Sequence, residues 1–187
     1  MVLDDKLTEC RGVSLHPLAA EDIHELVRNL HWRSAMEMAI VYGLEGDGKL
    51  IEGFGRASFS SAMSFSVRYK GEVMAIIGLS RSLQLWGQFS KRAFELRAIP
   101  RMIRCIPALM EYLNTSESVH CNIWEQSDGM IELMNVAGFR PEHEIDHMGH
   151  KLIRFFYCGR DGLQVMRKHY GPSPTERPAR TPLTKWS

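Results

Sequence analysis

Residues 88 to 93, which read Gln-Phe-Ser-Lys-Arg-Ala, place two cations where a helix is expected to begin. The free amides and the positive dipole end of a helix start attract anions. Lys91 and Arg92 would each oppose that dipole by about 0.3–1 kcal/mol unless an anion lies nearby. The segment therefore indicates a site for a phosphate-bearing ligand. The alternatives are a solvated helix face, or a surface that docks an acidic protein or a nucleic acid.

Positive charge continues beyond this segment. Arg97, Arg101 and Arg104 follow at spacings of four and three residues, so a single helix would carry them as a basic stripe on one face. Apolar residues recur every three or four positions from 96 to 113, which predicts such an amphipathic helix. Pro100 fits its first turn, whereas Pro107 predicts a kink.

Two side chains are candidates for acid–base catalysis. Glu37 lies on a helix predicted from Ser34 to Gly43, but Ser34 and Glu37 also match a capping box, and that structural role is the favoured interpretation. His120 lies on a strand predicted over 119 to 124, where a histidine held by its neighbours in the sheet is the commoner case. Neither residue identifies a reaction by itself.

Metal chemistry is not expected. The four cysteines are widely spread and form no CxxC pair, so neither a zinc site nor a disulfide framework is predicted. His143, His147 and His150 lie close together in the sequence, but strand and turn conformations do not make such side chains converge. This use of cysteine fits a reducing cytoplasm.

Charge and hydropathy exclude several classes of partner. The 187-residue chain has 23 Lys and Arg against 22 Asp and Glu, which argues against nucleic acid or an anionic membrane. The first residues lack the basic start and apolar run of a signal peptide, and nowhere do roughly 18 apolar residues occur together. We therefore expect a cytoplasmic protein without a membrane partner.

The order of the expected elements predicts one α/β domain over residues 1 to 170. A hairpin is predicted to turn at Lys70-Gly71, and residues 45 to 55, which are rich in glycine, are expected to form a loop. Residues 171 to 187 are polar and rich in proline, and are expected to form a flexible tail. Strands are predicted at 13–17, 64–69, 72–80, 84–86, 119–124, 144–146 and 150–158, and further helices at 20–30 and 128–138.

This order, together with the segment MIELMNVAGFRPEHEI, resembles the GNAT superfamily of acyl-CoA-dependent N-acetyltransferases over residues 12 to 158. The family's helix pattern is matched by Leu133, Gly138 and Phe139, and is not matched by Met130 or Met134. The hairpin, the Trp-bearing fourth strand and the Gly-Phe ending are most similar to small GNAT-like proteins of short-tailed bacteriophages. The resemblance implies a mixed central sheet of about six to seven strands, flanked by helices and splayed between the fourth and fifth strands.

The resemblance also implies residues that bind acetyl-CoA. The family holds the cofactor's diphosphate in a Q/R-x-x-G-x-G/A loop, onto which residues 88 to 93 align with Lys91 in place of the first glycine. The backbone of the fourth strand and the residue before the later helix would contact the pantetheine arm. The implied diphosphate residues are Gln88, Ser90, Lys91, Arg92 and Ala93, and the implied pantetheine residues are Leu85, Trp86 and Ser127.

The usual catalytic groups of the family are absent at the matching positions. Met134 stands where many members have a tyrosine acid, and the fourth strand offers Gln84 and Trp86 instead of a carboxylate base. The resemblance thus implies an N-acetyltransferase with a degenerate active site, which would act on an amine of a protein or a small molecule in a host cytoplasm. The alternative is a noncatalytic GNAT-fold protein that contacts a virion or host protein.

Overall fold

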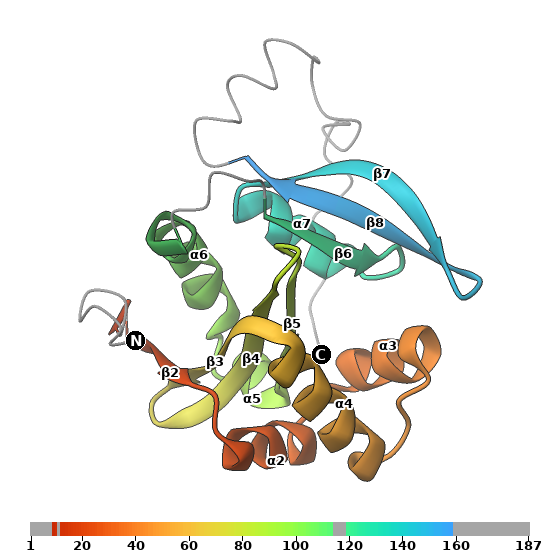
Figure 1. Cartoon of the computed structure of the whole chain (residues 1–187). Coiled ribbons are helices and arrows are strands. Elements are labelled where there is room, and N and C mark those ends of the chain that lie inside the picture. Colours follow the sequence, from red (N-terminus) through yellow and green to blue (C-terminus); the bar gives the residue numbers. More distant parts are fainter. Residues whose placement is uncertain (1–8, 11, 114–118, 159–187) are drawn as a thin grey trace.

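A computed structural model of the protein describes residues 9–10, 12–113 and 119–158, which form two β-sheets packed between helices (Figure 1). The first sheet is antiparallel, and its strands in spatial order are β1 (Glu9–Cys10), β2 (Val13–Pro17), β3 (Ser61–Tyr69), β4 (Glu72–Ser80) and β5 (Leu85–Phe89). The second sheet has the order β6 (His120–Trp124), β8 (His150–Tyr157) and β7 (Phe139–His147). The expected α/β architecture is confirmed. The described residues form eight strands, one more than the seven predicted, and the additional strand is the short β1.

Two tight turns fix the register of the longest strand pairs. Lys70 and Gly71 have φ values of 54° and 84°, and Met148 and Gly149 have φ values of 50° and 82°. Two consecutive residues with positive φ match the twist of the antiparallel strands that flank them. The hairpin predicted at Lys70-Gly71 is therefore confirmed.

Helices cover both faces of the first sheet. On one face, α2 (Ala20–Arg28), α3 (Trp32–Tyr42) and α4 (Asp47–Ser60) surround a core that includes Leu26, Phe54 and Ile76. On the other face, α5 (Lys91–Glu95), α6 (Ile99–Leu113) and α7 (Asp128–Val136) close a larger core around Met74 and Phe139. Figure 1 shows α2 and α4 on the side of the first sheet opposite α6. Both faces of β4 are consequently buried, as its apolar sequence suggests.

The two sheets meet at a single point and then separate. Gln84 and His120 form an isolated parallel bridge, in which the His120 amide donates to the Leu83 carbonyl over 3.0 Å. Beyond this bridge, within the part of the chain that the structure describes, β5 pairs with β4 alone and β6 pairs with β8 alone. The splay expected between the fourth and fifth predicted strands is thus present between β5 and β6.

The prediction of a loop over residues 45 to 55 is wrong, since α4 occupies most of this segment. Leu50 and Phe54 lie one helical turn apart and are buried against α2, and this burial outweighs the helix cost of the glycines. Gly53 has a packing reason of its own, because a Cβ atom there would lie 2.6 Å from Leu44. Glycine content alone was therefore a misleading signal.

The predicted start of α3 is also wrong. The helix begins at Trp32 with His31 as its N-cap, and the His31 side chain accepts a hydrogen bond from the Arg33 amide. Ser34 is buried inside the helix, so the capping box of Ser34 and Glu37 does not form. Gly43 ends the helix with a φ of 65°, as predicted. The structural explanation that competed with a chemical role for Glu37 is thereby removed.

The basic stripe does not lie on one continuous helix. Helix α5 ends at Glu95, α6 begins at Ile99, and Arg97 lies between them with a φ of 51°. Ala98 is fully buried at this break. Pro100 lies in the first turn of α6, as predicted, and α6 continues through Pro107.

The predicted flexible tail lies outside the described residues. No helix in the described ranges is long and apolar enough to cross a membrane.

Candidate functional site

The outer edge of β5 carries backbone groups that no described residue binds. Ser80 donates to the Gln84 carbonyl over 2.9 Å, and Ser90 donates to the Met74 carbonyl over 2.8 Å. Because hydrogen-bonded and non-bonded pairs alternate along an antiparallel ladder, Trp86 and Gln88 also bond to β4. The backbone groups of Leu85 and Gly87 then point outward, into the splay.

Both ends of this free edge are occupied. At one end the Leu83 carbonyl accepts from the His120 amide, and the parallel bridge between Gln84 and His120 pairs the Leu85 amide with the His120 carbonyl. At the other end the Phe89 carbonyl accepts from the His31 amide over 3.1 Å. The Leu85 carbonyl and the backbone groups of Gly87 remain without a partner among the described residues, over about the length of one extended dipeptide. This stretch can therefore pair with an extended chain that carries amide groups.

The amides that follow β5 are largely used within the protein. The Lys91 amide donates to the Asn29 carbonyl over 2.7 Å, and the Ala93 amide donates to Ser90, whose hydroxyl caps α5 at 3.3 Å. Ser90 is fully buried and also pairs in a bridge with Leu30. The segment that aligns with the diphosphate loop therefore packs between α5 and the α2–α3 connection. The amides of Ser90, Lys91 and Ala93 all donate hydrogen bonds within the protein.

The two adjacent cations of this segment have different surroundings. Arg92 makes a two-pronged ion pair with Glu72, at 2.6 and 2.9 Å, and a third contact of 2.7 Å with Glu95. These contacts raise the pKa of Arg92 and lower that of Glu72, chiefly through the hydrogen bonds between the two side chains. Lys91 is exposed and forms no ion pair with a described residue. Lys91 is therefore available to an external anion, whereas the charge of Arg92 is neutralised.

Helix α3 spans the splay and contacts both sheets. Gln88 of β5 donates to the sulfur of Met38 over 3.5 Å, while Val41 packs against Trp124 and Leu152 of the second sheet. Glu37 lies next to Met38 on this helix and is partly buried. Among the described residues its carboxylate has no hydrogen-bond partner, and burial raises its pKa to about 7. A carboxylate in this state can accept a proton at neutral pH.

The face of the second sheet turned toward α3 carries polar side chains beside apolar ones. His120 and Asn122 are half-buried and share the face of Trp124, which packs against α3. Arg154 on β8 is the cross-strand neighbour of Asn122, and its Nε donates to the Asn122 side-chain oxygen over 3.1 Å. The His120 ring contacts Phe156 with centroids 5.6 Å apart. Burial and the nearby Arg154 lower the pKa of His120.

Asn122 and Arg154 were not among the residues predicted from the sequence. The signal was available in principle, because strand alternation places residues 120, 122 and 124 on one face of β6. Only the register between β6 and β8, however, brings Arg154 beside Asn122. That register depends on an antiparallel pairing across about thirty residues, which periodicity does not reveal.

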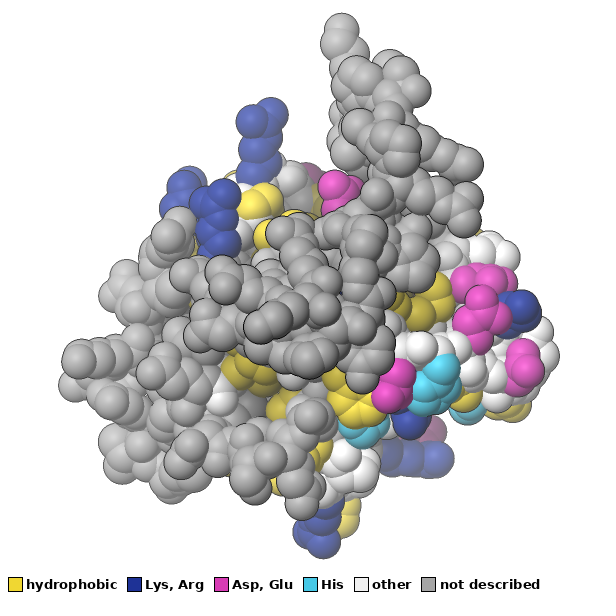
Figure 2. Space-filling view, turned by 90° about the horizontal axis from the view of Figure 1, so that it is seen from above, with side chains coloured by type: hydrophobic (Ala, Val, Ile, Leu, Met, Phe, Trp, Pro, Cys, Tyr) yellow, Lys and Arg dark blue, Asp and Glu magenta, His cyan; other side chains and the backbone are white. Residues whose placement is uncertain are grey.

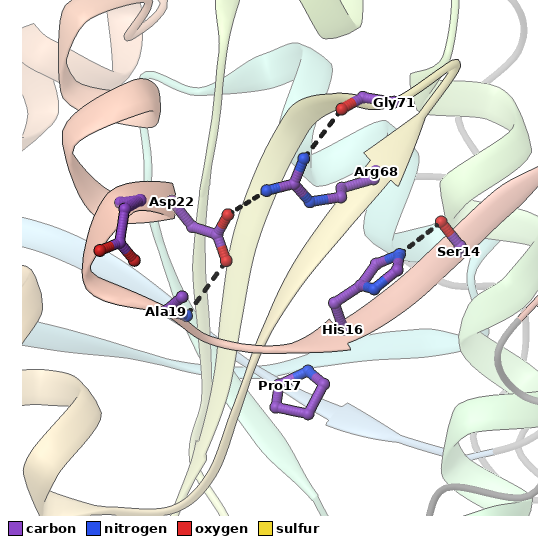
Figure 3. A pocket seen from close by; sticks show the side chains of 8 residues that line it. Ser14, His16, Pro17, Ala19, Asp22, Arg68 and Gly71 are labelled. Carbon is purple, nitrogen blue, oxygen red and sulfur yellow. Dashed lines mark hydrogen bonds and ion pairs between the residues drawn. The ribbon is translucent and has the colours of Figure 1, made fainter.

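A separate hollow of about 590 Å³ lies between β2, the start of α2 and the Lys70-Gly71 turn (Figure 3). Its wall contains the buried Asp22, which pairs with Arg68 and accepts from the Ala19 amide over 3.1 Å. Burial alone would raise the pKa of Asp22, but the hydrogen bonds and the guanidinium together lower it. Strands β3 and β4 separate this hollow from β5, so it is distinct from the splay. We interpret the Asp22–Arg68 ion pair in its wall as a clasp that holds α2 on the sheet.

Comparison with known proteins bears on the fold. No family model matches the chain, and no curated protein is similar to it in sequence. A GNAT-family acetyltransferase from Bacillus anthracis is similar in structure, with a TM-score of 0.58, 11% identity, and coverage of 80% of this chain and 95% of that chain. The chain has the GNAT fold.

Two further GNAT-fold structures were solved with coenzyme A. The spermidine N-acetyltransferase from Vibrio cholerae, in complex with CoA and spermine, has a TM-score of 0.57 and 13% identity, over 78% of this chain and 94% of that chain. The aminoglycoside acetyltransferase AAC(6')-Ib, in complex with coenzyme A and kanamycin, has a TM-score of 0.60 and 12% identity, over 83% of this chain and 99% of that chain. The three similarities extend over nearly the whole of each relative.

Two positions of the GNAT helix pattern have structural roles here. Met134 is 6% exposed and packs in the core beside Phe139, so a hydrophobic side chain at this position stabilises the fold. Ser127 is the N-cap residue of α7, and its carbonyl accepts from the Met130 and Ile131 amides at 2.9 and 3.0 Å. The Ser127 side chain makes no capping hydrogen bond. Within the described ranges, no group of three or more His, Cys, Asp or Glu residues is arranged to hold a metal ion.

Proposed function

We propose that the protein is an acyl-CoA-dependent N-acetyltransferase. The observation that carries the proposal is the outer edge of β5 at the Leu85 carbonyl and Gly87, which pairs with no described strand and lies inside the splay of a GNAT fold. The pantetheine arm of acetyl-CoA contains amide groups, and it would extend this edge by backbone pairing. Trp86 would support the site from behind, since its ring lies against Gly78 and its Nε1 donates to Ser61 over 2.8 Å.

The diphosphate of acetyl-CoA would be bound mainly by side chains. The engaged amides of Ser90, Lys91 and Ala93 favour this over the loop geometry that a glycine at position 91 would permit. Lys91 would supply the positive charge and Gln88 a side-chain amide, while Ser90 and Ala93 would shape the segment. Arg92 would hold α5 to β4 through Glu72 and not contact the diphosphate.

Acetyl-CoA would supply the acetyl group as a thioester. The acceptor amine forms a bond to the acetyl carbon, the bond from carbon to sulfur breaks, and the thiolate takes up a proton. Glu37 would accept the proton that an ammonium acceptor must lose before it attacks. Its raised pKa and the absence of a hydrogen-bond partner among the described residues support this role, whereas Met134 supplies no acid. Positioning across the splay would contribute most of the remaining rate enhancement.

A matched pair of neighbouring variants tests the cofactor site. Lys91→Gln is expected to raise the Kd of acetyl-CoA by roughly 3- to 10-fold, because it removes a charge-assisted contact. Arg92→Gln removes the same charge one residue later and is expected to leave the Kd unchanged. Calorimetric titration of both variants and the wild type measures this. Failure of millimolar acetyl-CoA to bind the wild type would reject the proposal.

The second candidate function is noncatalytic contact with a virion or host protein. A row of exposed apolar side chains along α3 favours it, since Trp32, Met36 and Ile40 are 61%, 38% and 41% exposed. The sequence resemblance to phage proteins is the basis for proposing that the protein is phage-encoded and acts in the host cytoplasm or the virion. Mass spectrometry of purified virions would distinguish those two locations. Transfer of acetyl groups by the purified protein, with Trp32→Ala fully active and no partner captured, would reject the noncatalytic function.

A further inference from the structure

Arg154 is half-buried, and its guanidinium makes one hydrogen bond within the described residues. Its Nε is fixed by the Asn122 side chain at 3.1 Å, and it forms no salt bridge with any residue in the described ranges. Its two terminal nitrogens therefore lack a partner in that part of the chain. Removing a guanidinium from water without compensation is costly, so a site of this kind favours an anionic ligand.

The position of Arg154 connects it to the splay. Asn122 lies on β6, the strand that borders the splay opposite β5, and its bond to Nε draws the guanidinium toward that strand. Arg154 also lowers the pKa of His120, which stands at the bridge where the two sheets meet. The guanidinium thus lies on the side of the second sheet that faces α3 and Glu37.

Acidic side chains gather elsewhere on this sheet. Figure 2 shows them where the β7–β8 hairpin lies, together with histidines and a basic side chain. Glu144 pairs with Lys151 at 3.1 Å, and Glu142 lies 2.8 Å from the His143 ring. Glu142 acts on His120 only as a weaker influence than burial and Arg154. Arg154 is therefore a cation on the face of β6 and β8 turned toward α3, and Glu142 lies on the neighbouring β7, beside the His143 that is the cross-strand partner of Arg154.

We propose that Arg154 binds a carboxylate of the acceptor, so that the substrates are amines that also carry a carboxylate, such as free amino acids. The planar fork of an arginine matches the two oxygens of a carboxylate, and Asn122 would act as the positioning residue that orients it. The inference rests on the proposed acetyl transfer and goes beyond it, since it specifies the acceptor. An acceptor that carries a carboxylate would also differ from spermine, the polyamine in the structure of the Vibrio cholerae enzyme.

Matched pairs of amines that differ only by one carboxylate test the proposal. Lysine and cadaverine, tyrosine and tyramine, and arginine and agmatine are each offered with acetyl-CoA. The wild type is expected to use at least one carboxylate-bearing member with a kcat/KM at least 10-fold above that of its partner. Arg154→Gln is expected to abolish that preference through the KM of the acceptor, by roughly 10- to 100-fold for a lost two-pronged charged contact. Arg154→Lys should recover part of it, and the exposed Arg56→Gln serves as the charge-matched control.

Binding measurements separate this proposal from the acetyltransferase proposal. The same amino acids and amines are titrated calorimetrically into the CoA-saturated protein and into the free protein, without turnover. Binding of a carboxylate-bearing member that is lost in Arg154→Gln supports the inference even if no product forms. The inference is overturned if the decarboxylated amines bind equally well or better, or if no amino acid binds in either state. It is also overturned if Arg154→Gln weakens CoA binding instead, because the guanidinium would then serve the cofactor's phosphates. Thermal melting of each variant checks that the fold is retained.

Discussion

Replacing Glu37 by glutamine is expected to stabilise the protein at alkaline pH. Burial raises the pKa of this carboxyl from its ordinary value of 4.5 to about 7. The folded state therefore binds the proton more tightly than the unfolded state does, and the free energy of unfolding falls as the pH rises from about 4.5 to 7. The full pKa difference corresponds to at most about 3 kcal/mol above pH 8. Glutamine avoids this cost because it cannot ionise.

Urea unfolding of the wild type and Glu37→Gln from pH 4 to pH 8 measures the effect. The two free energies of unfolding should nearly coincide at pH 4, and the variant should exceed the wild type by up to about 3 kcal/mol at pH 8. Glu45→Gln is the control, since Glu45 is exposed and its substitution should give no pH-dependent difference. A difference for Glu37→Gln that stays constant across this range would refute the reasoning, because Glu37 would then be solvated or paired when charged.

The same variant tests the chemical role of Glu37. Loss of a general base lowers kcat by about 10²- to 10⁴-fold, so Glu37→Gln should be more stable and less active than the wild type at pH 8. Wild-type activity should also rise with pH through about 7, as the carboxylate loses its proton. Retention of full activity by a stabilised variant would leave positioning alone as the source of catalysis.

Further substitutions test the packing and the clasp. Gly78→Ala should destabilise the protein by about 1–3 kcal/mol, because the new Cβ would lie 2.3 Å from the Trp86 ring. Adding Trp86→Leu should recover part of this free energy of unfolding, which urea unfolding measures. Asp22→Asn should cost about 3–5 kcal/mol at pH 7 by leaving Arg68 unpaired. Because the pKa of Asp22 is lowered in the folded protein, its ionised carboxylate stabilises the fold above its ordinary pKa, and this stabilisation is lost as the pH falls. The loss in free energy of unfolding caused by Asp22→Asn should therefore become smaller in acid.

The parts of the fold that local signals determine were predictable from the sequence. Lys70-Gly71 specifies its own turn, because glycine and a short run of alternating residues favour a two-residue hairpin. The apolar repeat of α6 was also informative, although it concealed the break at Arg97, where a positive φ separates two helices. A buried Ala98 permits the break, and burial of that residue is a tertiary property.

The site was harder to predict because its residues are brought together by long-range pairing. Glu37 was identified, but its local sequence favoured a capping role that the start of α3 at Trp32 removes. The amides around Lys91 are engaged by Asn29 and Ser90, and no local pattern indicates that the α2–α3 connection would reach them. Arg154 became a candidate only through its register with Asn122.

Amide hydrogen exchange at Gly87, measured by NMR with and without millimolar acetyl-CoA, tests the central claim most directly. In the free protein this amide should exchange faster than those of Trp86 and Gln88, which bond to β4. Acetyl-CoA should slow exchange at Gly87, because the pantetheine arm would accept its hydrogen bond. Binding of acetyl-CoA that leaves the Gly87 amide unprotected, or an absence of binding, would contradict the proposed site on the free edge of β5.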